Sequence, residues 1–373
     1  MQKYRTDKTW EWNLQNAPAP VQVDAVPSLN GRWNWCGIPV RSPMGISAGP
    51  LLNSGWILQY AAAGFDILVY KTVRSVARAC YDLPNLVPVE VSSLEEAGSI
   101  VPEKSEMSGS WAVSFGMPSV TPEAWQKDIQ RTKSMLASGQ VLVVSVVATA
   151  APSLEGEAAL EQLADDFADC ARLAMDAGAD GIEANFSCPN VDTADGQLYQ
   201  HPRSAARVTE RIRNAISTAP LVLKIGRVET RQAAESLVLA TSQFINGMAM
   251  TNSISAHVRC ENGQLLFDGQ QRGICGDATR LTSISQLKLF RDVCQDLIKS
   301  GRLTADMQPQ LIGVGGISTA EHVNDYLAAG ADSVALATAA MVNPRVGLEI
   351  RESLSGNPPH RFHETGVRRG VTG

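Results

Sequence analysis

Residues 185–190 read NFSCPN, which places one cysteine, Cys188, between two asparagines, Asn185 and Asn190. The segment follows the apolar run DGIEA, so we expect it at the carboxyl end of a β-strand. An asparagine amide both donates and accepts hydrogen bonds, and two of them beside a thiol favour a pocket for a polar ligand. The alternative is a buried structural thiol, which leaves both asparagines unexplained.

Two lysines interrupt apolar, strand-like runs: Lys71 in LVYKTVR and Lys224 in LVLKIG. A lysine inside such a run is costly unless its ammonium meets an anion or a polar ligand. A single one could extend to the surface, but a pair near the ends of two strands predicts a shared ligand with negative character. A further run, ending TNSI, carries Asn252 and Ser253.

The segments GVGGIST and ALATAAM, at residues 313–319 and 335–341, predict a phosphate site. The first carries Gly315 and Gly316, whose bare backbone amides let a phosphate approach closely. The second opens a short helix, and a helix N-terminus favours an anion.

Eight short apolar runs alternate with amphipathic, helix-like stretches. The runs lie at 43–49, 66–73, 141–149, 180–187, 221–226, 247–252, 311–317 and 333–339. Near-continuous apolar runs are typical of parallel strands covered on both faces. The eightfold alternation predicts the α/β class and a (β/α)8 barrel. An open doubly wound sheet is the rival, but no GxGxxG opens a helix after an early strand.

Two connections are unusually long, residues 75–120 after the second run and 253–280 after the sixth. Connections of this length in a compact domain are usually functional insertions. In a barrel, the connections after the strand C-termini build the active-site face. We therefore expect both insertions on that face.

The composition indicates a globular, cytoplasmic protein. Apolar residues make up 44% and charged residues 19% of 373 residues, and the net charge of −6 argues against nucleic-acid binding. No apolar run reaches the roughly 20 residues of a membrane helix. The N-terminus lacks the apolar region of a secretory signal. Seven scattered cysteines without a CxxC pair argue against a disulfide framework and against a zinc or iron–sulfur site, so no metal is expected.

The chain is expected to divide into an N-terminal extension at 1–35, the barrel at 36–352 and a polar tail at 353–373. The first segment is rich in tryptophan. We expect its side chains to pack the bottom of the barrel or a subunit contact: Trp10, Trp12, Trp33 and Trp35.

In their order along the chain, NFSCPN, LVLKIG, TNSI, IGVGGI and ALATA resemble the dihydroorotate dehydrogenases, FMN-dependent barrels of pyrimidine biosynthesis. The similarity runs from about residue 31 to 350. It includes SPMGISAG, which resembles the first strand of that family and its small-residue floor under the flavin. The resemblance implies an oxidoreductase that converts dihydroorotate to orotate.

The resemblance also implies residue roles. Cys188 would remove a proton from C5 of dihydroorotate while hydride passes from C6 to flavin N5. Lys224 would lie against the pyrimidine edge of the flavin and stabilise its reduced, anionic form, with Lys71 near flavin and substrate. The implied substrate-binding residues are Asn185, Asn190, Asn252, Ser253, Gly116 and Met117. The implied FMN-binding residues are Ala48, Gly49, Lys71, Thr72, Lys224, Asn252, Gly276, Gly315, Gly316, Ala337 and Thr338.

One residue departs from the family pattern. Val113, in VSFGMPS, stands where the family usually has an asparagine on the substrate carboxylate, and such a lost anchor costs about 1–3 kcal/mol. An enzyme resembling dihydropyrimidine dehydrogenase, acting on a ring without that carboxylate, therefore stays an alternative. A barrel that binds a flavin or phosphorylated ligand without turnover is a second one.

The resemblance does not identify the electron acceptor, which could be fumarate, NAD or a quinone. Cysteine at position 188 resembles the cytosolic members, whereas membrane-associated members carry serine there, so we expect no membrane contact. A homodimer and a separate electron-transfer subunit both stay open.

Overall fold

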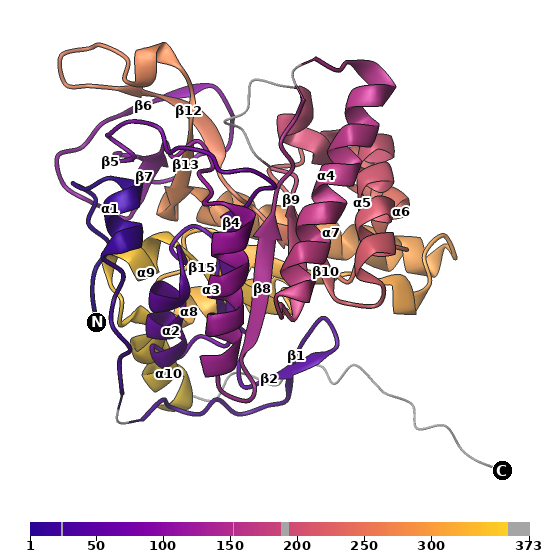
Figure 1. The fold of residues 1–373 in the computed structure, drawn as a ribbon, viewed down its shortest axis with the longest axis horizontal. Helices are drawn as coiled ribbons and strands as arrows, with labels where there is room; N and C mark the ends of the chain where they lie inside the picture. Colours follow the sequence, from indigo (N-terminus) through magenta and orange to yellow (C-terminus); the bar gives the residue numbers. More distant parts are fainter. Residues whose placement is uncertain (24, 152, 188–193, 357–373) are drawn as a thin grey trace.

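Eight short strands close into an all-parallel barrel, which confirms the predicted fold (Figure 1). The computed structural model describes residues 1–23, 25–151, 153–187 and 194–356. Around the barrel the strand order is β10-β11-β14-β15-β3-β4-β8-β9. All eight strands lie within the apolar runs or one residue beyond them: β3 (Met44–Ile46), β4 (Ile67–Val73), β8 (Val141–Val146), β9 (Gly181–Asn185), β10 (Leu221–Lys224), β11 (Gly247–Met250), β14 (Gln310–Val314) and β15 (Ser333–Leu336).

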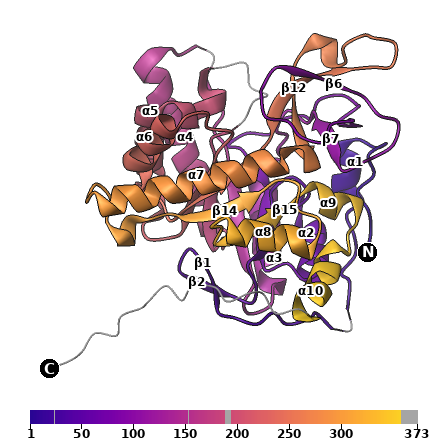
Figure 2. The same ribbon diagram turned by 180° about the vertical axis from the view of Figure 1, so that it is seen from behind.

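Helices follow the strands and cover the outside of the barrel, as the 3.6-residue apolar period of segments such as 159–180 predicts. Figure 2 shows α7 and α8 beside β14 and β15 from the opposite side. The helices are α2 (Ser54–Ala62), α3 (Pro122–Met135), α4 (Gly156–Asp176), α5 (Pro202–Ile216), α6 (Arg231–Thr241), α7 (Arg280–Lys299), α8 (Ala320–Ala328), α9 (Thr338–Val342) and α10 (Val346–Gly356). Short 3₁₀ turns lie at Ala194–Gln200, Phe267–Gly269, Asp277–Thr279 and Ala305–Met307.

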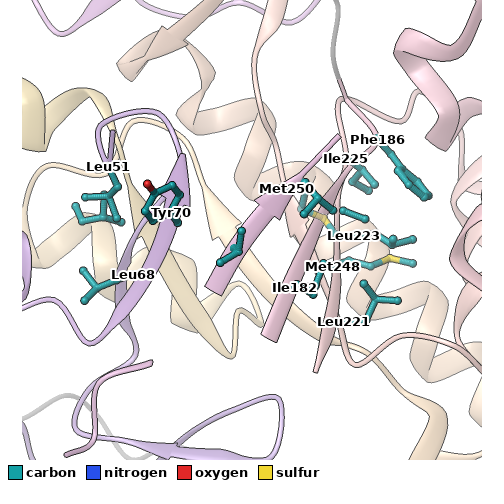
Figure 3. Packing of buried hydrophobic residues seen from close by; sticks show 14 of the residues in the cluster. Leu51, Leu68, Tyr70, Ile182, Phe186, Leu221, Leu223, Ile225, Met248 and Met250 are labelled. Atoms are coloured by element: carbon teal, nitrogen blue, oxygen red, sulfur yellow. The ribbon is translucent and has the colours of Figure 1, made fainter. Parts of the chain in front are cut away.

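Side chains of each strand alternate between two apolar clusters. The outer cluster lies between strands and helices and includes Leu68, Ile182 and Leu223 (Figure 3). The inner cluster fills the barrel and consists of the strand residues that alternate with those of the outer cluster, such as Ile67, Val69 and Val222. Because successive side chains of a strand point to opposite faces, this alternation assigns every further strand residue to the inside or the outside.

A hairpin of β1 (Trp33–Trp35) and β2 (Ile38–Val40) packs against the bottom of the barrel. Trp35 and Cys36 belong to the inner cluster. Gly181 and Gly247, the first residues of β9 and β11, leave room for them, since an added Cβ would lie 2.9 Å from the Trp35 ring and 3.2 Å from Cys36 Sγ. The expected position of Trp35 beneath the barrel is therefore confirmed.

The two long insertions combine into one five-stranded sheet with the order β5-β7-β13-β12-β6. Its strands are β5 (Leu86–Pro88), β6 (Ser99–Pro102), β7 (Ser110–Val113), β12 (Ile254–Arg259) and β13 (Arg272–Gly276). The sheet lies over the carboxyl ends of the barrel strands, as expected of the insertions (Figure 1). The pairings of β7 with β13 and of β6 with β12, which join the two insertions, are not apparent from the sequence.

The predicted division at residues 35 and 352 remains a prediction. The β1–β2 hairpin spans the first boundary, and α10 continues past the second to Gly356. Residues 357–373, which include most of the expected tail, lie outside the described residues. Within the described ranges, no helix combines the length and apolarity needed to cross a membrane.

Replacing Trp35 with alanine should lower the free energy of unfolding by about 3–5 kcal/mol, because Trp35 is 1% exposed and fills the barrel bottom. Urea unfolding followed by circular dichroism measures the loss. Trp33→Ala in the same hairpin is the control, since Trp33 is only partly buried and should cost clearly less. Equal losses of unfolding free energy for the two variants would contradict the conclusion that the Trp35 side chain closes the bottom of the barrel.

Candidate active site

A cavity of about 660 Å³ lies between the carboxyl ends of the barrel strands and the insertion sheet. Its volume is that of a site for a cofactor-sized ligand. Every predicted site residue in the described part of the chain lines it: Ala48, Gly49, Lys71, Thr72, Gly116, Met117, Asn185, Lys224, Asn252, Ser253, Gly276, Gly315, Gly316, Ala337 and Thr338. Cys188 and Asn190 lie outside the described residues.

The strand alternation directs both lysines into the barrel. Lys71 follows Val69 at an interval of two on β4, and Lys224 follows Val222 on β10, so each continues the inward-facing series. Lys71 is 9% exposed and Lys224 is 7% exposed. The register between β4 and β8 shifts between Tyr70 and Val73, and such a bulge lets the consecutive residues Lys71 and Thr72 both face the cavity.

A buried glutamate accompanies Lys224. Glu183 lies on β9, which pairs with β10, and Glu183 Oε1 is 4.0 Å from Lys224 Nζ. The Glu183 side chain is almost fully buried, and its Oε1 has no hydrogen-bond partner among the described residues. No sequence pattern singles out Glu183, because a glutamate in a short apolar run does not reveal which face of the strand its side chain takes.

Two of the predicted amide residues converge on Ser187. Asn185 Oδ1 accepts hydrogen bonds from the Ser187 backbone N–H and hydroxyl, each at 3.2 Å. Asn252 Nδ2 donates to the Ser187 carbonyl at 2.9 Å. Asn185 Nδ2 also lies 3.7 Å from Met117 Sδ, so residues from β9, the β11–β12 connection and the first insertion meet at one wall of the cavity.

The Gly315–Gly316 turn forms a tight cradle after β14. Both residues have positive φ, +130° and +62°. An added Cβ at Gly315 would lie 2.7 Å from Thr279 Oγ1, and one at Gly316 would lie 2.9 Å from Asp277 Cα. Tyr326 Oη donates to the Gly315 carbonyl at 2.6 Å and fixes the turn from α8. The turn therefore presents backbone rather than side chains to the cavity.

A small-residue floor lies beside this cradle. Ala48 and Gly49 follow β3, and a Cβ at Gly49 would meet nothing within 4 Å. Ala337 and Thr338 open α9 at the end of β15. A flat, phosphorylated ligand fits these features, with its phosphate at the cradle and its ring over the small residues.

Several lining residues were not predicted. Arg280 begins α7 next to Gly316, and its Nε donates to Asp277 Oδ1 at 2.9 Å. Cys275 on β13 lines the cavity, and burial raises the pKa of its thiol to about 11 against the opposing charge of Lys224, so the thiol is neutral near pH 7. Both lie in the second insertion, where a sequence without a regular period gives no sign of position.

The expectation for Trp10 is wrong. Trp10, in α1 (Trp10–Gln15), lines the cavity instead of packing beneath the barrel. It shares the wall with Trp111, Val113 and Phe115 from the first insertion. These side chains are mainly apolar, but Trp10 Nε1 is a buried donor without a hydrogen-bond partner among the described residues. Among the residues that the structure describes, no group of three or more potential metal ligands occurs.

Replacing Gly316 with alanine should destabilise the protein more than Gly301→Ala. Both glycines have a similar positive φ, +62° and +72°, which costs an alanine roughly 1–2 kcal/mol. Only at Gly316 would the new Cβ also press on the Asp277 backbone, since Gly301 has nothing within 4 Å. Urea unfolding of both variants measures the difference in unfolding free energy. Equal losses would show that the Gly316 turn has room for a Cβ beside the Asp277 backbone.

Comparison with known proteins places these features in one family. The family model described as dihydroorotate dehydrogenase matches residues 32–356. A dihydroorotate dehydrogenase of Dictyostelium discoideum is 29% identical over 376 residues, covering 95% of this chain and 98% of that protein. The catalytic subunits of dihydroorotate dehydrogenase B (NAD(+)) of Exiguobacterium sibiricum and Bacillus pumilus are each 28% identical, over 52% and 51% of this chain and 58% and 57% of their own lengths. The chain belongs to the dihydroorotate dehydrogenase family.

Proposed function

We propose that the chain oxidises dihydroorotate to orotate in pyrimidine biosynthesis, with FMN as its bound cofactor. Members of the family are flavin-dependent oxidoreductases that act on a CH–CH bond. The observation that carries the proposal is the convergence of predicted site residues from nine separate segments on one cavity that contains two buried lysines. Two buried ammonium groups lining one cavity favour a ligand of negative character, and FMN has a phosphate and an electron-poor ring.

The cavity suits FMN at both ends. The Gly315–Gly316 cradle and the start of α9 would hold the phosphate, while Ala48 and Gly49 would allow the ring to lie close to the backbone. Lys224 would face the polar edge of the ring from inside the barrel. Bound FMN would supply the acceptor for the hydride that leaves C6 of the substrate.

The remaining lining residues suit a flat ring of amides. Asn185 and Asn252 are oriented by their hydrogen bonds to Ser187, and each can pair with a ring N–H or C=O. Cys188 follows Ser187 directly in the sequence. We assign Cys188 as the base: its thiolate takes the C5 proton, and the C5–H electron pair becomes the C5=C6 double bond. A base in this position contributes about 10²–10⁴ to the rate.

A second candidate substrate is a dihydropyrimidine without a carboxylate. Val113 lines the cavity with Trp10, Trp111 and Phe115, and its side chain offers no donor at the position where the family usually has an asparagine. Dihydroorotate remains the first candidate, since its carboxylate can be met by Lys71 or by backbone N–H groups of residues 115–117, which line the same cavity.

The proposal extends to the reoxidation of the flavin and to the location of the protein. The bacterial relatives are named as NAD(+)-type catalytic subunits, which supports a separate electron-transfer subunit as one route; a homodimer is a further proposal. The described cysteines at 36, 80, 170, 260, 275 and 294 are free, which supports a reducing, cytoplasmic setting.

Anaerobic titration of the purified protein tests the proposed function. The protein should be yellow, and dihydroorotate should bleach its flavin absorbance with one equivalent of orotate formed. Dihydrouracil and dihydrothymine are the comparison substrates. Bleaching by these two alone would replace the first candidate with the second, and a flavin-loaded protein that no reduced pyrimidine bleaches would indicate a binding barrel without turnover.

Replacing Cys188 with serine or alanine should slow flavin reduction by about 10²–10⁴ without releasing FMN, because only the base is lost. Stopped-flow absorbance measures the rate, and the flavin content of the purified variant measures binding. Cys260→Ser is the control, since Cys260 lies outside the cavity lining and should leave the rate unchanged. An undiminished rate in both Cys188 variants would remove Cys188 from the reaction.

A further inference from the structure

Glu183 is a buried charge that the proposed reaction does not use. It is 4% exposed and continues the inward-facing positions of β9, where the alternate residues Ile182 and Ala184 belong to the outer cluster. Its strand neighbours in register are Ser145 on β8 and Val222 on β10. Ser145 Oγ is engaged with Thr72 Oγ1 at 3.0 Å. Glu183 therefore lies one layer below the cavity lining, inside the barrel.

Among the described residues, the cation that pairs with Glu183 is the Lys224 ammonium. The two groups are 4.0 Å apart, too far for a hydrogen bond but close enough for strong attraction where little water is present. Because Glu183 Oε1 has no hydrogen-bond partner among the described residues, the carboxylate depends on Lys224 for compensation. Lys224 in turn lines the cavity, so it lies between the carboxylate and the ligand.

We propose that Glu183 is a positioning residue that acts through Lys224: it holds the ammonium at the inner end of the cavity and offsets part of its charge. The inference rests on the proposed flavin site. A lysine beside the ring stabilises the negative charge that the flavin gains on reduction, and a carboxylate behind the lysine weakens that effect. Glu183 thereby keeps the flavin potential lower than Lys71 and Lys224 alone would set it.

The midpoint potential of the bound flavin, measured by anaerobic reductive titration against reference dyes, tests the proposal. Glu183→Gln keeps the shape of the side chain and removes its charge, so the potential should rise. We expect roughly a tenfold change in the reduction equilibrium, about 30 mV for a two-electron couple. Glu235→Gln, which removes the same charge from a surface pair with Arg302, should leave the potential unchanged. Glu183→Asp, which restores a carboxylate, should return the potential towards the wild-type value.

The same substitution in a Lys224→Met background separates action through Lys224 from a general field effect. With no ammonium to hold or offset, Glu183→Gln should shift the potential clearly less than in the wild-type background. Equal shifts in the two backgrounds, or no shift in either, would overturn the proposal.

A second measurement needs no flavin. Lys224→Met leaves Glu183 buried without a counter-charge, whereas the double variant Lys224→Met/Glu183→Gln buries two neutral groups. The double variant should therefore unfold at a higher urea concentration than Lys224→Met alone, and the reverse order would overturn the pairing. If the wild-type protein binds no flavin, the proposed function fails while this unfolding comparison still decides whether the two groups are coupled.

Discussion

A strand points successive side chains to opposite faces, and in a closed barrel this alternation decides where each functional group lies. The inward-facing residues at the start of the strands are apolar, such as Ile67, Val69 and Val222. They pack in the lower part of the barrel together with Trp35. Two residues further along, the same series delivers Lys71 and Lys224 to the upper end. The apolar core and the charged site are thus consecutive parts of one pattern, and a shift of one residue would move both lysines towards the helices.

The upper end needs a cover, because buried charges act strongly only where water is kept out. The two insertions supply it by pairing with each other, since β7 and β13 form the central contact of the five-stranded sheet. Alternate residues on one side of this sheet build a small apolar cluster of their own, which includes Val87, Ala112 and Ile274. The sheet is therefore held by its own core and can present Val113 and Cys275 to the cavity from a fixed frame.

The cavity presents two kinds of polar group: side chains from the barrel strands and backbone groups from the turns that follow them. The barrel strands present Lys71, Lys224 and Asn185, whose positions are set by strand register, whereas the glycine turn after β14 and the floor after β3 present bare backbone. Glu183 and Lys224 lie on the paired strands β9 and β10, so neither residue can move far without disturbing the strand pairing. A charge held in this way can tune a bound ring without contacting it.

Much of this organisation could be predicted from the sequence. The eight apolar runs, the lysines within two of them, the Gly315–Gly316 turn and the place of the insertions all arise from local patterns, because strand burial and turn chemistry are properties of short segments. Three features could be recognised only in the tertiary structure. They are the sheet that the two insertions share, the position of Trp10 in the cavity wall, and the burial of Glu183 beside Lys224. Each depends on contacts between segments about 40 to 160 residues apart, and a local pattern carries no information about which distant partner a residue will meet.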